Sequence, residues 1–140
     1  MSKDLSRKLT IAPVAEPVFF DSSSSGPSMY FYLDTQYSTL LRTVNNGGNF
    51  ALYLATQNYT GAVNDLLAVG EMKTITYISL NSTTAYKLTT LYIDGAAQTI
   101  KWAGGTAPAG TASAYDAYTF TIIKTAANTY TVLGNYAAFK

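Results

Sequence analysis

Residues 93–124, IDGAAQTIKWAGGTAPAGTASAYDAYTFTIIK, contain the features that decide the fold. They include the chain's single tryptophan, Trp102, and an Asp94-Gly95 pair. Asp-Gly is typical of two-residue hairpin turns. A Gly-Gly-Thr-Ala-Pro segment beginning at residue 104 predicts a tight loop, and residues 117–124 are rich in strand-forming Tyr, Thr, Phe and Ile. The stretch therefore predicts a hairpin, a loop and a return strand arranged around Trp102.

Within this stretch, alternation along each strand predicts which side chains point into the core. Successive strand residues point to opposite faces, so residues two apart share a face. This places Lys101 on the outer face and a core group inside, consisting of Ile100, Trp102, Tyr118, Phe120 and Ile122.

The rest of the chain from residue 29 also alternates between strand-like and turn-like segments. The expected strands are 29–34, 37–44, 49–55, 72–80, 85–94, 99–102, 117–124 and 129–139. Eight short strands at this spacing predict an all-β protein, an antiparallel β-sandwich or jelly-roll-like domain. In 72–80 and 85–94 apolar residues occupy both faces, with Tyr86, Leu88 and Tyr92 opposing Leu91 and Ile93. Such strands are usually covered on both sides, which predicts a homo-oligomer.

Residues 61–70, GAVNDLLAVG, have two interpretations. One is a helical turn with Asn64 or Asp65 as its N-cap. The other is a loop over the edge of the core, with Leu66, Leu67 and Val69 pointing inward. We favour the loop, because ten residues between two glycines make at best a marginal helix.

The N-terminal residues differ in character from the rest. Pro13 and Pro17 interrupt regular structure, and a run of four serines followed by Gly26-Pro27 indicates a flexible joint. We predict an extended arm and linker over residues 1–26 and a β domain over 27–140. The apolar pieces of the arm are too short to form a core, so the arm either packs locally at a frayed terminus or docks on a partner.

Composition excludes several classes of function. Charged residues make up 12% of the chain, about half the usual share, so we expect part of the surface to be covered by a partner. The net charge of +1, from scattered basic residues, disfavours nucleic-acid binding. The chain has neither cysteine nor histidine, which removes the commonest zinc ligands. No signal-peptide core or membrane-spanning stretch is present, so we expect a protein made in a cytoplasm that does not contact a membrane.

Few residues are candidates for chemistry. Asp94 and Asp116 are the best pair of carboxylates, but Asp is common in turns for its backbone hydrogen bonds, and we favour that structural role for both. We expect no enzyme, no catalytic residue, no metal site and no cofactor. The 12 tyrosines suit the core and subunit interfaces, or alternatively a sugar site, for which the loop residues Tyr59 and Tyr115 are the candidates.

Several segments carry a resemblance to a known family. They are IDG (93–95), QTIKW (98–102), GGTAP (104–108), DAYTFTIIKT (116–125) and VLG (132–134), with NFALYL (49–54) and GEM (70–72) upstream. Together they resemble the C-terminal β domain of virion appendage proteins of tailed bacteriophages, especially phages of marine bacteria and cyanobacteria. In that family a strand ends in K/W-W-x-G-G-x-x-P and is followed by D-x-Y-x-F. The resemblance covers roughly residues 49 to 139 and carries no catalytic residues.

The resemblance implies a non-enzymatic virion protein made in the host cytoplasm. Family members typically form trimers and occur as fibre tips, spikes and decorations of the capsid or tail. Because this chain has no long shaft, the resemblance favours a trimeric capsid decoration, or cement, protein or a short appendage. Its arm would contact capsid or tail proteins through Leu9, Ile11, Val18, Phe19 and Phe20. The alternative is a glycan- or receptor-binding module of a tail fibre, spike or baseplate. A glycan-cleaving enzyme has the least support, because two well-placed acids are not evident.

Overall fold

The computed structural model describes residues 15–22, 28–57 and 61–140, and these form an all-β protein with one short helix. Leu9, Ile11 and Tyr59 lie outside the described residues. The elements are β1 (Val18–Asp21), β2 (Ser28–Tyr32), β3 (Thr39–Arg42), β4 (Phe50–Ala55), α2 (Val63–Leu66), β5 (Met72–Leu80), β6 (Leu88–Ile93), β7 (Ala96–Gln98), β8 (Ile100–Trp102), the 3-10 turn η1 (Ala103–Gly105), β9 (Tyr115–Ala126) and β10 (Thr129–Phe139).

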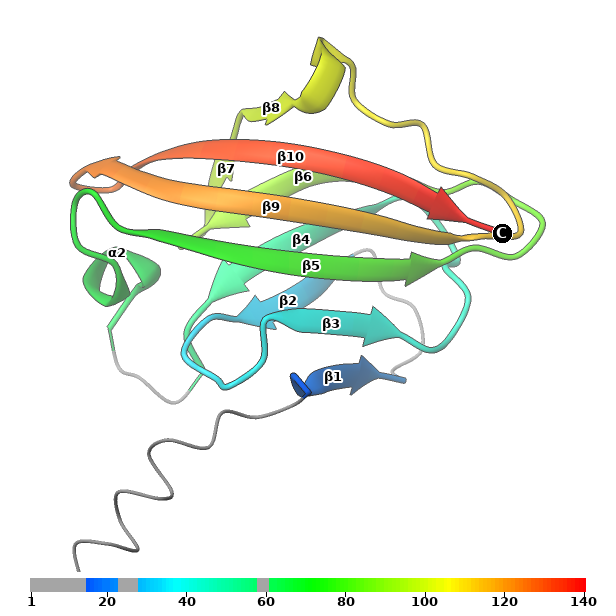
Figure 1. Ribbon diagram of the computed structural model, residues 1–140, viewed down its shortest axis with the longest axis horizontal. Helices are drawn as coiled ribbons and strands as arrows, with labels where there is room; N and C mark the ends of the chain where they lie inside the picture. The colour runs from blue at the N-terminus through cyan, green and yellow to red at the C-terminus, as the bar shows by residue number, and fades with distance from the viewer. Residues whose placement is uncertain (1–14, 23–27, 58–60) are drawn as a thin grey trace, which may run out of the picture.

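The strands form two sheets, and the chain passes back and forth between them. The six-stranded sheet has the order β1-β3-β5-β9-β10-β8, and the four-stranded sheet has the order β2-β4-β6-β7. Figure 1 looks onto the six-stranded sheet, with the four-stranded sheet behind it. From β1 to β6, odd strands enter one sheet and even strands the other. This part of the chain is therefore a flattened coil, each turn of which adds one strand to each sheet.

The sheets are mixed, so the prediction of an antiparallel fold was wrong. The pairs β1–β3, β3–β5, β2–β4, β4–β6 and β10–β8 are parallel. Parallel neighbours need a crossover connection, and here the crossover is itself a strand of the opposite sheet. Turn-like segments such as Asn45–Gly48 suggest hairpins, but this one leads from one sheet to the other. Antiparallel pairing is limited to β6–β7, β5–β9 and β9–β10.

Most expected strands are present, and the expected hairpin is confirmed. Strands β5 and β10 begin and end at the predicted residues. Asp94-Gly95 joins β6 to β7, and both residues have positive φ, 51° and 82°, as a two-residue hairpin turn requires. Strands β1 and β7 were not predicted, because residues 18–21 fall within the expected arm and residues 96–98 fall between the expected strands 85–94 and 99–102.

The core lies between the sheets and receives buried side chains from both. Phe50 of β4 links the layers, with its ring 5.5 Å from that of Tyr77 on β5 and 6.0 Å from that of Tyr118 on β9. Leu88 points inward with Leu91 and Ile93, not opposite to them as predicted. The β4–β6 register shifts beside Phe50, which changes the alternation of faces there.

The predicted core group around Trp102 packs together, though not at uniform depth. Tyr118, Phe120 and Ile122 are fully buried, whereas Ile100 and Trp102 are partly buried on the edge strand β8. The Trp102 ring lies edge-on to Phe120 at 5.8 Å and to Tyr118 at 6.3 Å. Trp102 is opposite Gly134 of β10, and a glycine here leaves room for the indole to reach the inner strands.

The favoured loop over residues 61–70 was wrong, because Val63–Leu66 form a helical turn. Its N-cap is Ala62, not Asn64 or Asp65. Val63 and Leu67 are the buried side chains, whereas Leu66 and Val69 are 37% and 62% exposed. A helical turn places residues four apart on one face, which explains why Val63 and Leu67 point inward together.

Candidate interaction surfaces

Asp94 stabilises helix α2 from a distant turn. One of its carboxylate oxygens accepts a hydrogen bond from the backbone N–H of Val63 at 2.8 Å, and the other accepts one from that of Asn64 at 3.0 Å. Asp65 adds a bond from the N–H of Ala62. At the other end of α2, the buried Lys124 ammonium donates to the carbonyls of Asn64 and Leu67. Both charges therefore satisfy helix ends, which is a structural role.

Replacing Asp94 with alanine is expected to lower the free energy of unfolding by about 1–2 kcal/mol, since two helix N–H groups lose their acceptor. Asp94→Asn is the matched control, because asparagine also tolerates the left-handed backbone and keeps one acceptor oxygen. It should cost clearly less than Asp94→Ala in urea unfolding. An Asp94→Ala variant as stable as the unmodified protein would show that the cap contributes nothing, and equal losses for the two variants would show that the one acceptor oxygen of asparagine does not replace the carboxylate.

Asp116 is fully buried and holds three segments of chain together. Its Oδ2 accepts hydrogen bonds from Asn81 Nδ2 at 3.1 Å and the Thr111 backbone N–H at 3.0 Å, and its Oδ1 accepts one from the Tyr136 hydroxyl at 2.7 Å. Asn81 is also bonded to Asn46, which joins another loop to the network. The three hydrogen bonds of this carboxylate each hold another segment of the chain in place. Asp116 does not line any of the pockets described below.

Asp94 and Asp116 lie near opposite ends of β9. Asp116 is near the start of that strand, whereas Asp94 caps the helix whose carbonyls meet Lys124. Eight residues of extended strand separate positions 116 and 124, roughly 26 Å. The two acids therefore do not form a catalytic pair.

Several tyrosines are held neutral by the fold. Burial raises the pKa of Tyr77 to about 12, with the nearby Arg42 partly opposing the shift. The pKa of Tyr136 is also raised to about 12, by burial and then by its bond to Asp116. Burial raises the pKa of Tyr118 further still. The Tyr77 hydroxyl has no well-formed hydrogen bond, although Arg42 and Ser79 lie beside it.

The raised pKa values predict a loss of stability in strong alkali. In the unfolded chain these phenols ionise near pH 10, whereas in the folded protein they stay protonated up to about pH 12. The free energy of unfolding is therefore unaffected by them below pH 10 and falls as the pH rises from 10 towards 12. For the buried Tyr77 this fall amounts to up to about 1.4 kcal/mol per pH unit. Urea unfolding between pH 9 and 12 should show this fall, and Tyr77→Phe should make it shallower. An unchanged slope in Tyr77→Phe would show that Tyr77 ionises equally easily in both states.

A row of stacked tyrosines crosses the outer face of the four-stranded sheet. Tyr30, Tyr53 and Tyr92 are opposite one another in register on β2, β4 and β6. The ring centroids are 5.1 Å and 4.4 Å apart, and the planes differ by 23° and 7°. Each ring covers the face of its neighbour, so the row presents mainly ring edges and hydroxyls to solvent. A sugar needs an open ring face, so this row mainly stabilises the sheet through cross-strand contacts.

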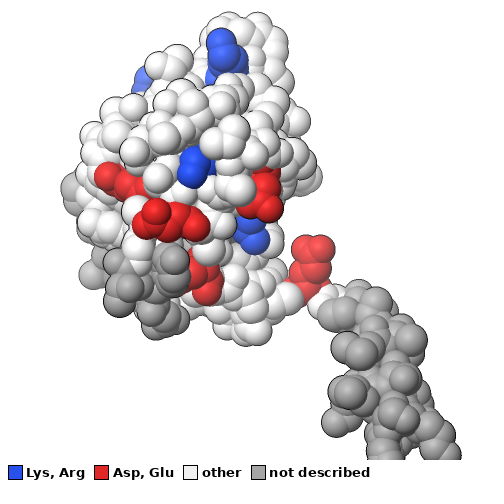
Figure 2. Space-filling model, turned by 90° about the vertical axis from the view of Figure 1, so that its left-hand side faces the viewer, with Lys and Arg blue, Asp and Glu red and all other residues white. Residues whose placement is uncertain are grey.

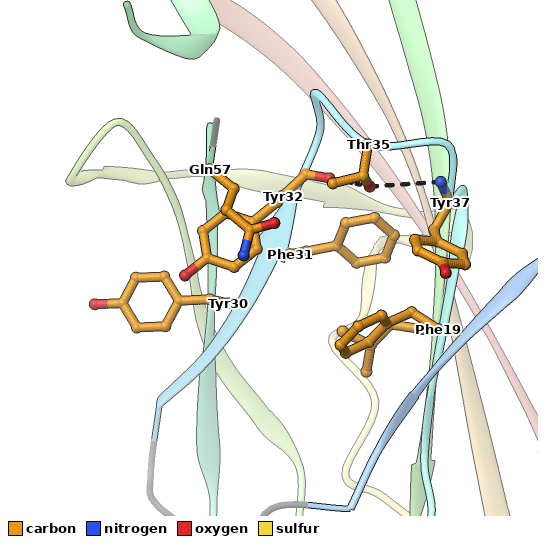
Figure 3. Close-up of a pocket in the computed structure, with 8 residues that line it drawn as sticks. Phe19, Tyr30, Phe31, Tyr32, Thr35, Tyr37 and Gln57 are labelled. Atoms are coloured by element: carbon orange, nitrogen blue, oxygen red, sulfur yellow. Dashed lines mark hydrogen bonds between the residues drawn. The ribbon is translucent and has the colours of Figure 1, made fainter. Parts of the chain in front are cut away.

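The described part of the predicted arm belongs to the sheet edge. β1 pairs with β3, so Val18, Phe19 and Phe20 lie in an edge strand. Phe19 packs edge-on against Tyr37 at 5.4 Å, whereas Phe20 is 65% exposed. Figure 3 shows Phe19, Phe31 and Tyr37 converging on a pocket of about 100 Å³. The pocket has room for little more than one apolar side chain.

Two wider hollows lie elsewhere on the surface. One, of about 400 Å³, is bordered by Asn81, Ser82, Tyr115 and Phe139, and Tyr115 is well exposed at its rim. The other, of about 450 Å³, lies beside Lys101 over β9 and β10. Both are open depressions, and neither is lined by an aspartate or a glutamate.

The outer face of the six-stranded sheet is the most unusual surface of the described chain. The register places outward on it Thr74, Thr76, Thr119 and Thr121, among other uncharged residues, and Lys101 on β8 is the one charged strand residue that faces outward. Six of the ten well-exposed large hydrophobic side chains of the described chain project from this face, namely Val18, Phe20, Met72, Tyr115, Leu133 and Phe139. Elsewhere charges do occur, and Figure 2 shows acidic and basic side chains interspersed at the end of the molecule that carries α2.

Sequence reasoning missed both this face and the tyrosine row as continuous surfaces. The alternating threonines of residues 74–76 and 119–121 were a readable signal, since they mark the outer side of each strand. The tyrosine row had no such signal, because it depends on parallel pairing between β2, β4 and β6, which are not consecutive in the chain.

Within the described residues, no group of three or more possible ligands is placed to hold a metal ion. In that same part of the chain, no helix has the length and apolar character needed to cross a membrane. Comparison with protein-family models, curated proteins and solved structures finds no match for this chain.

Proposed function

We propose that this chain is a non-enzymatic structural protein of a bacteriophage virion. In this proposal it forms a homotrimeric capsid decoration, or cement, protein or a short appendage made in the host cytoplasm. Its N-terminal arm contacts capsid or tail proteins, and the β domain projects from the particle. In this proposal the two facing sheets form a β-sandwich. Its strand order differs from that of a jelly roll, because the chain from β1 to β6 is a flattened coil.

One observation carries the proposal: a broad sheet face that is nearly free of charge and has most of the exposed apolar side chains. Exposed apolar side chains gathered on one uncharged face are typical of sites of protein–protein contact. The sequence pattern around KWAGGTAP supports the choice of a virion protein. The buried charges support a non-enzymatic role, since Asp116 and Lys124 satisfy loops and helix ends.

Addition of purified protein to phage shells that lack it tests the proposal. The full-length chain should bind the shells and raise their melting temperature, and a variant without residues 1–14 should bind far more weakly while it keeps β1 and its pairing with β3. Full-length protein that neither binds nor stabilises shells would overturn the decoration role.

The second candidate function is a host-glycan-binding module of a tail fibre, spike or baseplate. The exposed Tyr115 at the rim of the 400 Å³ hollow supports it. Glycan-array binding that disappears in Tyr115→Ala, with unchanged stability, would support this function over assembly. A chain that binds no glycan on such an array would argue against it.

A further inference from the structure

The outer face of the six-stranded sheet is charge-free to a degree that restricts its partners. Apart from the edge residue Lys101, the outward side chains of its strands are apolar, hydroxyl or amide groups. Charged groups of a partner placed against this face would be desolvated without an opposite charge to pair with, and this desolvation costs binding free energy. The face therefore fits a surface that is equally free of charge.

The polar groups at the centre of the face can pair with a copy of themselves. Thr39, Thr76, Thr119 and Asn135 are opposite one another on β3, β5, β9 and β10 and form one row. A second row joins Thr74 to Thr121, whose hydroxyls are 3.4 Å apart. Hydroxyls and amides both donate and accept hydrogen bonds, so these rows can pair with hydroxyl and amide groups of neighbouring copies without a fixed relative orientation, as three faces around one axis require.

Apolar side chains surround these rows on the same face. Phe20 and Val18 project at the β1 edge, Met72 at one end of β5, and Phe139 at one end of β10. The strands of the four-stranded sheet carry no charged residue either, but of the well-exposed large hydrophobic side chains only Tyr30 projects from its outer face. Covering the outer face of the six-stranded sheet with an equally uncharged surface therefore removes more apolar area from water. The apolar side chains supply attraction without a charge pattern that would repel an identical surface.

We infer that the outer face of the six-stranded sheet is the contact between copies of this chain, with these faces meeting about the axis of the oligomer. The inference deepens the proposed function, and it assigns the partner of this face as a second copy. It also moves Val18 and Phe20 of β1 from the expected shell contact to the contact between copies, so the virion shell contacts other parts of the chain.

A pair of matched substitutions tests this assignment in the full chain. Thr119→Lys places a charge at the centre of the face, and Thr90→Lys makes the same change on the outer face of the four-stranded sheet. Light scattering after gel filtration should show that Thr119→Lys reduces the mass to the 15.0 kDa of one chain, while Thr90→Lys keeps the mass of the unmodified protein. An oligomeric Thr119→Lys, or dissociation by Thr90→Lys alone, would overturn the assignment.

Cross-linking tests the same face without adding charge. The chain has no cysteine, so Thr121→Cys and Thr90→Cys each carry a single thiol. A short bismaleimide should link chains through Cys at position 121 and not at position 90, and the reverse pattern would overturn the inference. A trimer that does not bind shells would contradict the virion role and leave this inference standing. A monomer that binds shells would contradict this inference and the trimeric state, and would leave the shell-binding role standing.

Discussion

Replacing Asp116 by alanine is expected to lower the free energy of unfolding by on the order of 4 kcal/mol, the largest effect of any substitution considered for this chain. The carboxylate accepts bonds from Asn81, Thr111 and Tyr136, and it is fully buried. Removing it deletes three hydrogen bonds to a charged acceptor, each worth about 1.5–3 kcal/mol, and leaves the Thr111 N–H without its acceptor. The loss is below the full sum, because the Asn81 amide keeps two carbonyl acceptors and the Tyr136 hydroxyl keeps Thr111 Oγ1. Because whole domains are stable by about 5–15 kcal/mol, the variant should be only marginally folded.

Urea unfolding followed by circular dichroism measures this loss, with Tyr136→Phe as the matched control. That variant keeps the ring and removes a single donor to Asp116, so it should cost about 1 kcal/mol. If Asp116→Ala cost no more than Tyr136→Phe, the carboxylate would not be the centre of the network.

Gly134→Ala is expected to displace the Trp102 ring and to cost about 2 kcal/mol. A Cβ at position 134 would lie 2.7 Å from Ile100 Cγ2 and 2.8 Å from Trp102 Cε3, closer than carbon atoms approach. The edge strand β8 must move outward to relieve the overlap, and small-to-large changes in packed sites typically cost 1–3 kcal/mol. Since Trp102 is the only tryptophan, its fluorescence should shift to longer wavelength as the ring gains solvent.

Gly48→Ala is the matched control for this change, because a Cβ there meets no atom within 4 Å. It should leave both the emission maximum and the unfolding free energy almost unchanged. A wild-type emission spectrum in Gly134→Ala would mean that Trp102 does not rest against Gly134.

Much of the fold followed from local patterns in the chain. Alternation identified Tyr118, Phe120 and Ile122 as buried, and Asp94-Gly95 identified the hairpin, because both features depend on neighbouring residues alone. The sheet pairing did not follow, because a turn-rich connection looks the same whether the next strand joins the same sheet or the opposite one. Short edge strands such as β1 and β7 carry too few residues to show a period.

The candidate surfaces were predictable only in part. Apolar residues on both sides of β5 indicated a covered outer face, and the structure adds that this face continues over β9 and β10. The structural role expected for Asp94 and Asp116 is confirmed by their hydrogen bonds. Their partners, however, lie far away in sequence: the helix N–H groups bound by Asp94 are 30 and 31 residues away, and Asn81 is 35 residues from Asp116. Contacts at such separations depend on the coil of strands, which no local pattern in the sequence indicates.

The mass of the full-length protein in solution tests the account most directly. Sedimentation equilibrium at micromolar concentration should give a single species of three times the 15.0 kDa chain mass, because the charge-free sheet face is expected to be covered by other copies. A species of 15.0 kDa that stays monomeric as concentration rises would contradict the account, since the outer face of the six-stranded sheet would then remain exposed to water with no partner covering it.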